Sequence, residues 1–195
     1  AGRHQHGAYL LKEMQADGMT PDAVTMAALV HACARSSNLG AAEEVVGSMV
    51  LLDIEPTVEV YSSLMDAHVQ NESPASLRRV FCLLDEMMGK GISPTDVTYI
   101  HVLRACLLLK DADRAFAMYE RAYDEGVVLN DKSHNLLIKV CTVTGRLNEG
   151  VELVKRVARI HGELQSQTLN ALIRALSSVS VDRALRMLSL MRTLG

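Results

Sequence analysis

The chain has 195 residues, of which 49% are hydrophobic but only 4% aromatic, and it contains no Trp. It is long enough to bury a sizeable core, which has to be built from aliphatic side chains. The formal net charge of −3 and the sequence pI of about 6.2 argue against a strongly electropositive surface that binds nucleic acid indiscriminately. The four Pro and twelve Gly residues do not gather into a linker, so we expect no domain boundary.

The start of the sequence and its apolar stretches bear on targeting. The longest apolar stretches fall short of the roughly 20 residues that cross a bilayer, so we expect a soluble chain with no membrane partner. The opening AGRHQHG has neither an initiating Met nor an apolar signal core. We therefore expect the sequence to begin inside a longer polypeptide, with any targeting peptide upstream.

One pattern occurs twice. The segments MQADGMTPDAVTMAALVHAC (14–33) and MMGKGISPTDVTYIHVLRAC (87–106) both place a Met four residues before a Gly, then a Pro and a Val-Thr pair, and both end in Ala-Cys. A pattern that returns at a period of about 20 to 50 residues indicates an array of stacked units. Starting each unit after this punctuation gives a partial repeat at 1–22, repeats at 23–57, 58–95, 96–130 and 131–165, and an incomplete repeat at 166–195.

The apolar residues of each unit recur at helical rather than alternating spacing. In the repeat 96–130, for example, Val97, Ile100, Leu103 and Leu107 form one apolar stripe. Each unit is therefore predicted to fold as two helices joined by a turn.

Helix breakers and capping residues mark the predicted turns. The pair Ser73-Pro74 is typical of an N-cap followed by the first helical residue. Glycine tolerates the left-handed conformation that ends many helices, and a proline beyond it prevents the helix from continuing. The residues assigned to turns within repeats are Asn38, Ser73, Pro74 and Gly145, and those assigned to the ends of second helices are Gly18, Gly91, Gly126, Pro21, Pro56 and Pro94.

Four segments resemble a known family, the pentatricopeptide repeat. They are EMQADGMTPD (13–22), EMMGKGISPT (86–95), DVTYIHVLRAC (96–106) and HNLLIKVCTVTGRLNEGVELV (134–154). The family motif reads approximately V-V-T-Y-N-T-L-I-D-G-L-C-K-A-G-R-L-D-E-A, then E-M and G-I-x-P-D, over 35 positions. The resemblance covers nearly the whole chain and implies an all-α fold, a right-handed α-solenoid of stacked antiparallel helix pairs in 35-residue repeats. The tetratricopeptide repeat is disfavoured because its W-x-x-L-G-x-x-Y pattern needs a Trp.

Three of the four cysteines occupy one position of the repeat. Cys33, Cys106 and Cys141 are each the eleventh residue of their unit. Equivalent positions in stacked helices lie roughly 8–10 Å or more apart, beyond the Cα separation of about 7 Å that a disulfide permits. We interpret them as buried thiols in a reducing compartment, and Cys82 on a second helix is predicted to pack as well.

No pattern in the sequence predicts a metal site, a cofactor or a catalytic centre. His4 and His6 have the spacing of a surface metal contact, but no further ligand follows at a suitable interval. The adjacent acidic residues, such as Asp111 with Asp113, fall in turns or on second helices, where they point in different directions. Phosphate loops, nucleophile elbows and His-Glu zinc motifs are absent from the sequence, so we expect no enzyme.

The resemblance implies a function. Pentatricopeptide repeat proteins bind single-stranded RNA in mitochondria or plastids, one base per repeat, in a groove lined by the first helices. In the family the fifth and the last residue of each unit read the base, the second position sandwiches it and the thirteenth faces phosphate. The residues implied for RNA binding are Asp22, Ala27, Thr57, Ser62, Thr95, Ile100, Asn130, Asn135, Gln165 and Asn170 as base readers, Val24, Val97 and Lys132, with Glu59 and Gln167, at the second position, and Arg35 at the thirteenth.

The sequence departs from the family at several of these positions. Ala27 and Ile100 have no side-chain hydrogen-bonding group, so their repeats can stack against a base but cannot read its edge. The thirteenth position carries one cation only, Arg35; the other units have Gln70, Leu108, Val143 and Ser178 there. Because phosphate contacts supply much of the affinity for nucleic acid, we expect this segment alone to bind RNA weakly.

Two functions remain open from the sequence. The first is a single-stranded RNA-binding segment of an organellar RNA processing, stability or translation factor. The alternative is a degenerate array that acts as a structural or protein-docking scaffold in an organellar ribosome or RNA polymerase assembly. Readable pairs of fifth and last residues favour the first, whereas the hydrophobic replacements Ile100, Leu108 and Val143 favour the second.

Overall fold

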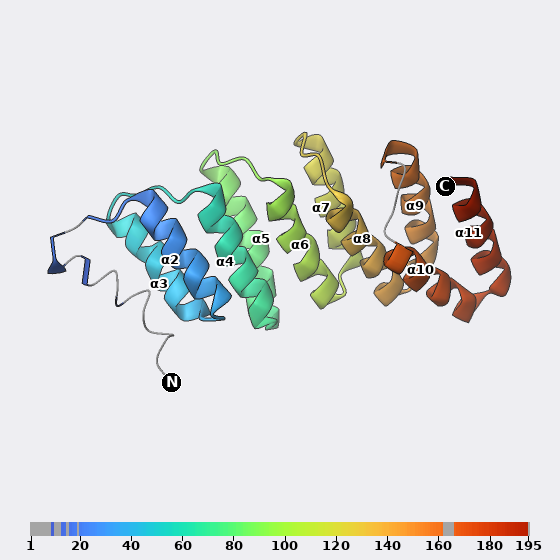
Figure 1. The fold of residues 1–195 in the computed structure, drawn as a ribbon, viewed down its shortest axis with the longest axis horizontal. Helices are drawn as coiled ribbons and strands as arrows, with labels where there is room; N and C mark the ends of the chain where they lie inside the picture. Colours follow the sequence, from blue (N-terminus) through green and yellow to red (C-terminus); the bar gives the residue numbers. More distant parts are fainter. Residues whose placement is uncertain (1–8, 10–12, 15, 19, 162–165, 195) are drawn as a thin grey trace. The chain divides into compact units, whose positions relative to one another are not determined.

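The computed structural model describes residues 9, 13–14, 16–18, 20–161 and 166–194, and within these ranges the chain forms helices and no β-strand (Figure 1). The all-α class expected from the sequence is confirmed. The helices follow one another as α2 (Ala23–Arg35), α3 (Leu39–Leu51), α4 (Val58–Asn71), α5 (Pro74–Gly89), α6 (Asp96–Leu109), α7 (Ala112–Asp124), α8 (Asp131–Thr144), α9 (Leu147–His161), α10 (Ser166–Val179) and α11 (Val181–Leu194). We call α2, α4, α6, α8 and α10 the first helices and the others the second helices.

The chain divides into two compact units, Ala1–Ala105 and Cys106–Gly195. In the first unit α2 packs against both α3 and α4, and α4 packs against α5. In the second unit α8 packs against α7 and α9, and α10 packs against α8, α9 and α11. The first helices α2, α4, α8 and α10 therefore each contact their own second helix, as stacked helix pairs require.

Aliphatic side chains fill both cores, as the composition predicted. In the first unit the fully buried residues include Met26, Leu84 and Met87, together with Tyr61 and Tyr99, which are 2% and 0% exposed. The second unit buries residues such as Ala115, Leu137, Ile138, Val157 and Leu172. None of the described helices has the length and hydropathy that a membrane span needs.

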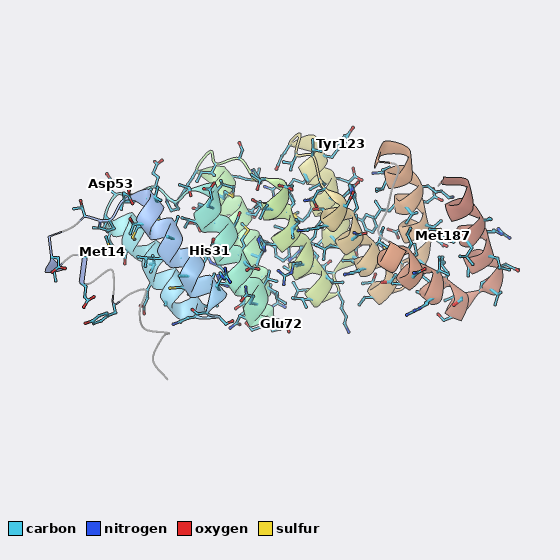
Figure 2. The ribbon with its side chains drawn as sticks, in the orientation of Figure 1. Met14, His31, Asp53, Glu72, Tyr123 and Met187 are labelled. Carbon is cyan, nitrogen blue, oxygen red and sulfur yellow. The ribbon has the colours of Figure 1, made fainter. Side chains whose placement is uncertain are left out.

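The helix that ends at Gly89 shows how the turn residues work. Gly91 has φ +74°, and its N–H donates to the carbonyl oxygen of Met88 at 2.9 Å. The N–H of Ile92 donates to the carbonyl oxygen of Met87 at 3.1 Å, which completes a Schellman motif. Gly18 and Gly126 have the same left-handed backbone, so the predicted helix ends at these glycines are confirmed. Asp53 lies at the corresponding place after α3, with φ +56° (Figure 2).

The predicted turns within repeats are also confirmed. The Ser73 hydroxyl accepts from the N–H of Ser76 at 3.2 Å, and Pro74 is the first residue of α5. The Asn38 side chain accepts from the N–H of Ala41 at 3.2 Å and caps α3. Gly145 ends α8 with φ +76°.

The apolar stripe predicted for 96–130 is wrong for most of its residues. Val97 is 47% exposed and Ile100 is half-buried, whereas the core side of α6 consists of Tyr99, Val102, Leu103 and Cys106. Both sets satisfy helical spacing because α6 is apolar on nearly every side. Periodicity alone therefore could not decide which face of this helix turns inward.

The cysteines divide three to one. Cys33, Cys106 and Cys141 are buried free thiols, as predicted, but Cys82 is exposed, so the prediction that it packs is wrong. Burial raises the pKa of Cys106 to about 12 and that of Cys141 to about 11. Both groups are therefore neutral thiols at physiological pH and behave as small core residues.

We expect Gly91→Ala to lower the free energy of unfolding by about 1 kcal/mol, because an L side chain in the left-handed region is disfavoured by roughly that amount. A Cβ at this position would meet no atom within 4 Å, so the cost is conformational and involves no clash. The measurement is urea unfolding.

The matched control is Gly89→Ala, two residues earlier. Gly89 lies inside α5, and a Cβ added there would likewise meet no atom within 4 Å. Alanine at this position is expected to raise the free energy of unfolding by up to about 1 kcal/mol, because it restricts the unfolded chain. A shift of the same sign in both variants would contradict this account of the helix end.

Candidate nucleic-acid interface

Each first helix carries one face that is not buried in the core. Its second, fifth, ninth and thirteenth residues are spaced by three or four positions and so share one side of the helix. We call these residues the open stripe. In the described part of the chain they are Val24, Ala27, His31 and Arg35 on α2; Glu59, Ser62, Asp66 and Gln70 on α4; Val97, Ile100, Arg104 and Leu108 on α6; Lys132, Asn135, Lys139 and Val143 on α8; and Asn170, Arg174 and Ser178 on α10.

All of these residues except Asn135 are exposed or half-buried. At the second position Val24 is 76% exposed and Val97 is 47% exposed, so apolar side chains face solvent there. At the thirteenth position Leu108 is 41% exposed and Val143 is 52% exposed, while Arg35 is exposed as well. The open stripe therefore offers apolar contact surface with few cations at the position that the family resemblance assigns to phosphate.

The last residue of a repeat precedes the next first helix, and at Asp22 and Asn130 its side chain caps that helix. The Asp22 carboxylate accepts from the N–H of Thr25 at 2.7 Å, and hydrogen bonds from Thr25 lower the pKa of Asp22. The Asn130 side-chain oxygen accepts from the N–H groups of Lys132 at 2.9 Å and Ser133 at 3.2 Å. These side chains are held in place by the backbone that they cap.

The two threonines at the last position behave differently from each other. The Thr95 hydroxyl accepts from the N–H of Thr98 at 3.4 Å, while the N–H of Thr95 donates to the Thr98 hydroxyl at 3.1 Å. Thr57 makes no such capping bond; its hydrogen bond to Glu59 instead lowers the pKa of that carboxyl group. The N-cap role of the last position was missed from the sequence, although Asp, Asn and Thr are residues that caps prefer.

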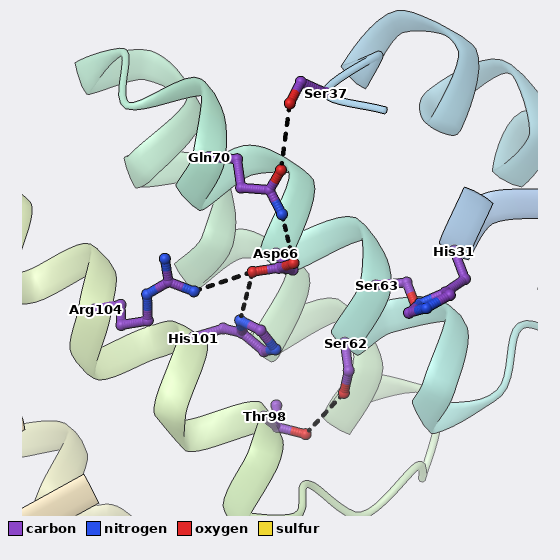
Figure 3. A network of polar contacts seen from close by, with 9 residues as sticks. All are labelled: His31, Ser37, Ser62, Ser63, Asp66, Gln70, Thr98, His101 and Arg104. Atoms are coloured by element: carbon purple, nitrogen blue, oxygen red, sulfur yellow. Dashed lines mark hydrogen bonds and ion pairs between the residues drawn. The ribbon is translucent and has the colours of Figure 1, made fainter. Parts of the chain in front are cut away.

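In the repeat 58–95 the structure brings the two expected base readers together. The Ser62 hydroxyl lies 3.4 Å from the Thr98 hydroxyl (Figure 3), and the Thr98 hydroxyl lies 3.3 Å from that of Thr95. Ser62 and Thr95 are thus linked through a buried threonine of the next repeat. Their spacing is set by hydrogen bonds within the first unit.

Asn135 differs from the other residues at the fifth position. It is 5% exposed, and neither its amide nitrogen nor its amide oxygen has a hydrogen-bond partner among the described residues. At the same position Ala27, Ser62 and Ile100 are half-buried, and Asn170 is exposed. Gln165 and the side chain of Gln167 lie outside the described residues, as do His4 and His6.

A network of polar side chains joins α4 to α6 and to the turn after α2, along the open stripe of the first unit (Figure 3). The Asp66 carboxylate accepts from Arg104 Nη1 at 3.1 Å and from Gln70 Nε2 at 2.6 Å. The Gln70 amide oxygen in turn accepts from the Ser37 hydroxyl at 3.4 Å. His101 Nδ1 lies 3.4 Å from the Asp66 carboxylate.

Two further observations describe the surroundings of this network. Burial lowers the pKa of His101 more than the neighbouring carboxylate of Asp66 raises it, so the imidazole is neutral near pH 7. His31 Nδ1 lies 3.4 Å from the Ser63 hydroxyl, between α2 and α4.

The sequence did not point to Asp66 and Arg104, because the family resemblance implies roles for the second, fifth, thirteenth and last positions only. Both are ninth residues and precede a thirteenth residue by one helical turn, so helical periodicity could have found them.

A scan against family models finds two matches. The model described as pentatricopeptide repeat domain matches residues 9–71 and 82–144, and the model described as PPR repeat matches residues 132–160. Together these matches cover more than half of the chain.

Curated relatives from Arabidopsis thaliana match most of this chain. A pentatricopeptide repeat-containing protein named as chloroplastic is 32% identical over 149 residues, which are 75% of this chain and 17% of the relative. A second one, named as mitochondrial, is 25% identical over 179 residues, which are 76% of this chain and 20% of the relative. The chain thus spans less than a third of the length of these relatives.

Two solved structures share the fold. The PPR domain of Arabidopsis thaliana protein-only RNase P 1, in complex with tRNA, has a TM-score of 0.77 at 17% identity and covers 90% of this chain and 91% of that chain. The pentatricopeptide repeat protein PPR10 of maize, in complex with an 18-nucleotide psaJ RNA element, has a TM-score of 0.71 at 22% identity and covers 100% of this chain and 32% of that chain. The solenoid fold class expected from the sequence is confirmed.

We expect Asn130→Ala to lower the free energy of unfolding by about 1 kcal/mol, because the first turn of α8 loses its cap. Asn130→Ser is the control, since serine is also a good N-cap residue and retains most of the stability. The measurement is urea unfolding, together with hydrogen exchange at the N–H groups of Lys132 and Ser133. Unchanged exchange at both amides in Asn130→Ala would show that the side chain does not hold this turn.

Proposed function

Because the chain belongs to the pentatricopeptide repeat family, we propose that its first helices bind single-stranded RNA, with one base placed at each repeat. The observation that carries this proposal is the open stripe, whose four positions share one side of the helix and are exposed or half-buried in α2, α4 and α6. Within a unit, side chains that repeat from one first helix to the next match the repeated bases of an extended single strand.

The residues of the stripe would divide the work of recognition. Val24 and Val97 would pack against base faces, because apolar side chains that face solvent gain by covering such a surface. Ser62 would offer a hydroxyl to a base edge, next to Thr95 at the last position. Ala27 and Ile100 would contribute packing without reading an edge.

The buried side chain of Asn135, unpaired among the described residues, supports the proposal because it destabilises the fold. A buried amide without hydrogen-bond partners destabilises a fold by about 1–3 kcal/mol, so such a residue calls for a reason other than stability. A base edge that reached the fifth position of this repeat would provide the missing donor and acceptor. Asn170, exposed at the same position of the next first helix, could bind an edge without prior rearrangement.

The proposed cellular role takes its support from the relatives. Several of them are named as chloroplastic or mitochondrial. We propose that this chain also acts in a plastid or a mitochondrion, in the processing, stability or translation of a transcript. In this role the repeats would supply RNA binding.

We expect Asn135→Ala combined with Asn170→Ala to weaken RNA binding about tenfold or more, because two base edges lose their hydrogen bonds at about 1 kcal/mol each. Asn135→Ala alone should leave the free energy of unfolding unchanged or raise it, since the amide makes no hydrogen bond to the described residues of the free protein. The measurements are recovery of the bound transcript after crosslinking and urea unfolding of each variant.

Asn148→Ala is the matched control, because Asn148 is an exposed Asn on the second helix α9. It should leave RNA recovery unchanged. Equal recovery of RNA by the double variant and the unaltered protein would count against the proposal.

A docking function is the second candidate, favoured by one observation. Leu108 and Val143 are exposed at the position where a phosphate-binding residue is expected, and apolar side chains there suit a protein surface better than an RNA backbone. Under this alternative the stripe would hold a protein of an organellar ribosome or RNA polymerase assembly.

We expect Leu108→Glu combined with Val143→Glu to release such a protein without unfolding the repeats, because both side chains already face solvent. The measurement is co-purification of partner proteins from the organelle, with circular dichroism to check the fold. If the complex survived in the double variant, the docking function would be contradicted.

A further inference from the structure

The ninth position of the first helices carries a row of charged side chains. Arg104, Lys139 and Arg174 are cations, and His31 and Asp66 occupy the same position of their helices. In every first helix the ninth residue lies one turn before the thirteenth, on the same face. The cations that the thirteenth position lacks are therefore present on the open stripe, one turn closer to the N-terminus of each helix.

Asp66 is the one acidic residue in this row, in the described part of the chain as in the sequence. It lies on α4, between the helix that carries His31 and the helix that carries Arg104. Its side chain is 29% exposed and that of Arg104 is 41% exposed, so both are within reach of a ligand on the stripe. An anion at this point opposes the positive charge of Arg104 in the same unit.

Among the described residues, the Asp66 carboxylate interacts with three neighbouring side chains. One carboxylate oxygen accepts from Arg104 Nη1 at 3.1 Å and lies 3.4 Å from His101 Nδ1, while the other accepts from Gln70 Nε2 at 2.6 Å (Figure 3). Gln70 is the thirteenth residue of its unit. Asp66 therefore engages both a cation of the ninth position and the polar residue at the phosphate-facing position of its own helix.

Asp66 neutralises the charge of Arg104 and so weakens its attraction for phosphate. His101 is neutral near pH 7 because burial lowers its pKa, so Asp66 and Arg104 form a pair with no net charge. A phosphate that approaches Arg104 meets the repulsion of Asp66 and competes with it for the guanidinium. Counterion release from this repeat is then largely lost.

We propose that the ninth-position cations bind the phosphates of single-stranded RNA and that Asp66 lowers this affinity by holding Arg104, an inference that rests on the RNA-binding function proposed above. Asp66 is a positioning residue in this scheme: it acts on RNA through Arg104 and Gln70. The repeat 58–95 is thereby the weakest electrostatic point of the stripe in the first unit.

Asp66→Asn tests the proposal in the full-length protein. The probe is a fluorescein-labelled single-stranded RNA of random sequence, and binding is followed by fluorescence anisotropy over a series of KCl concentrations. At low salt the affinity is expected to rise about fivefold, because one anion is removed and one cation is released. The slope of log affinity against log salt is expected to steepen by about 0.7, the value for one added phosphate contact on a single strand.

The double variant Asp66→Asn with Arg104→Gln separates the two effects. Without Arg104 no new phosphate contact can form, so the steeper salt dependence should disappear. If the double variant kept the steeper slope, Arg104 would not be the released cation and the inference would be overturned.

Asp113→Asn is the matched control for net charge. Asp113 also pairs with an arginine, Arg146, but it lies on the second helix α7, so the substitution changes the net charge equally away from the stripe. It should leave both the affinity and the salt slope unchanged. An equal gain in Asp113→Asn would show that net charge alone is responsible and would overturn the inference.

The remaining outcomes distinguish this inference from the proposed function. Saturable binding by the unaltered protein with no gain in Asp66→Asn would overturn the inference and leave RNA binding intact. No binding by the unaltered protein or by any variant at low salt would remove the proposed function, and the inference with it.

Folding is checked by thermal melting, with Asp66→Ser as a second variant that removes the same charge. Failure of both Asp66 variants to melt cooperatively, while Arg104→Gln does, would assign Asp66 a purely structural role and overturn the inference.

Discussion

The helix pairs of this protein depend on one another, because neither helix of a pair can cover its apolar side alone. Within each unit, first helices pack against second helices and against the next first helix, and aliphatic side chains are enclosed between them. In first helices such as α2 and α4 this packing leaves another side of the helix open. The open stripe is therefore the side of a first helix that its neighbouring helices do not cover.

The ends of the first helices connect stability to the candidate site. The last residues Asp22, Thr57 and Asn130 are the N-caps of the helices that follow them, and Asp22 and Asn130 use side-chain oxygens for this purpose. The same oxygens belong to residues that the family resemblance assigns to base reading. Capping fixes where these side chains lie, and it limits how many of their lone pairs remain for a ligand.

Local signals in the sequence predicted much of this. The capping pair Ser73-Pro74, the left-handed Gly91 and the eleventh-position thiols of Cys106 and Cys141 depend on nearby backbone geometry or on the repeat period, and the structure confirms each of them. The prediction was wrong where it misjudged which face of a helix is buried.

The face of α6 and the exposure of Cys82 are the two examples. Val97 faces solvent although it belongs to a stripe of helical spacing, since Tyr99 and Val102 on the same helix take the buried side. Cys82 lies beside the buried residues Leu83 and Leu84 but points outward. Only the position of the neighbouring helices decides which residues turn inward.

The family and the turn residues between the helices thus follow from the sequence, because a period and its punctuation are properties of residues close together in the chain. The pairing of Asp66 with Arg104, the link from Ser62 through Thr98 to Thr95, and the burial of Asn135 follow from the tertiary structure alone. These residues meet, or are enclosed, only when separate helices are brought side by side. The sequence determines which side chains are charged or can form hydrogen bonds, but the packing of the helices decides which of these side chains a ligand can reach.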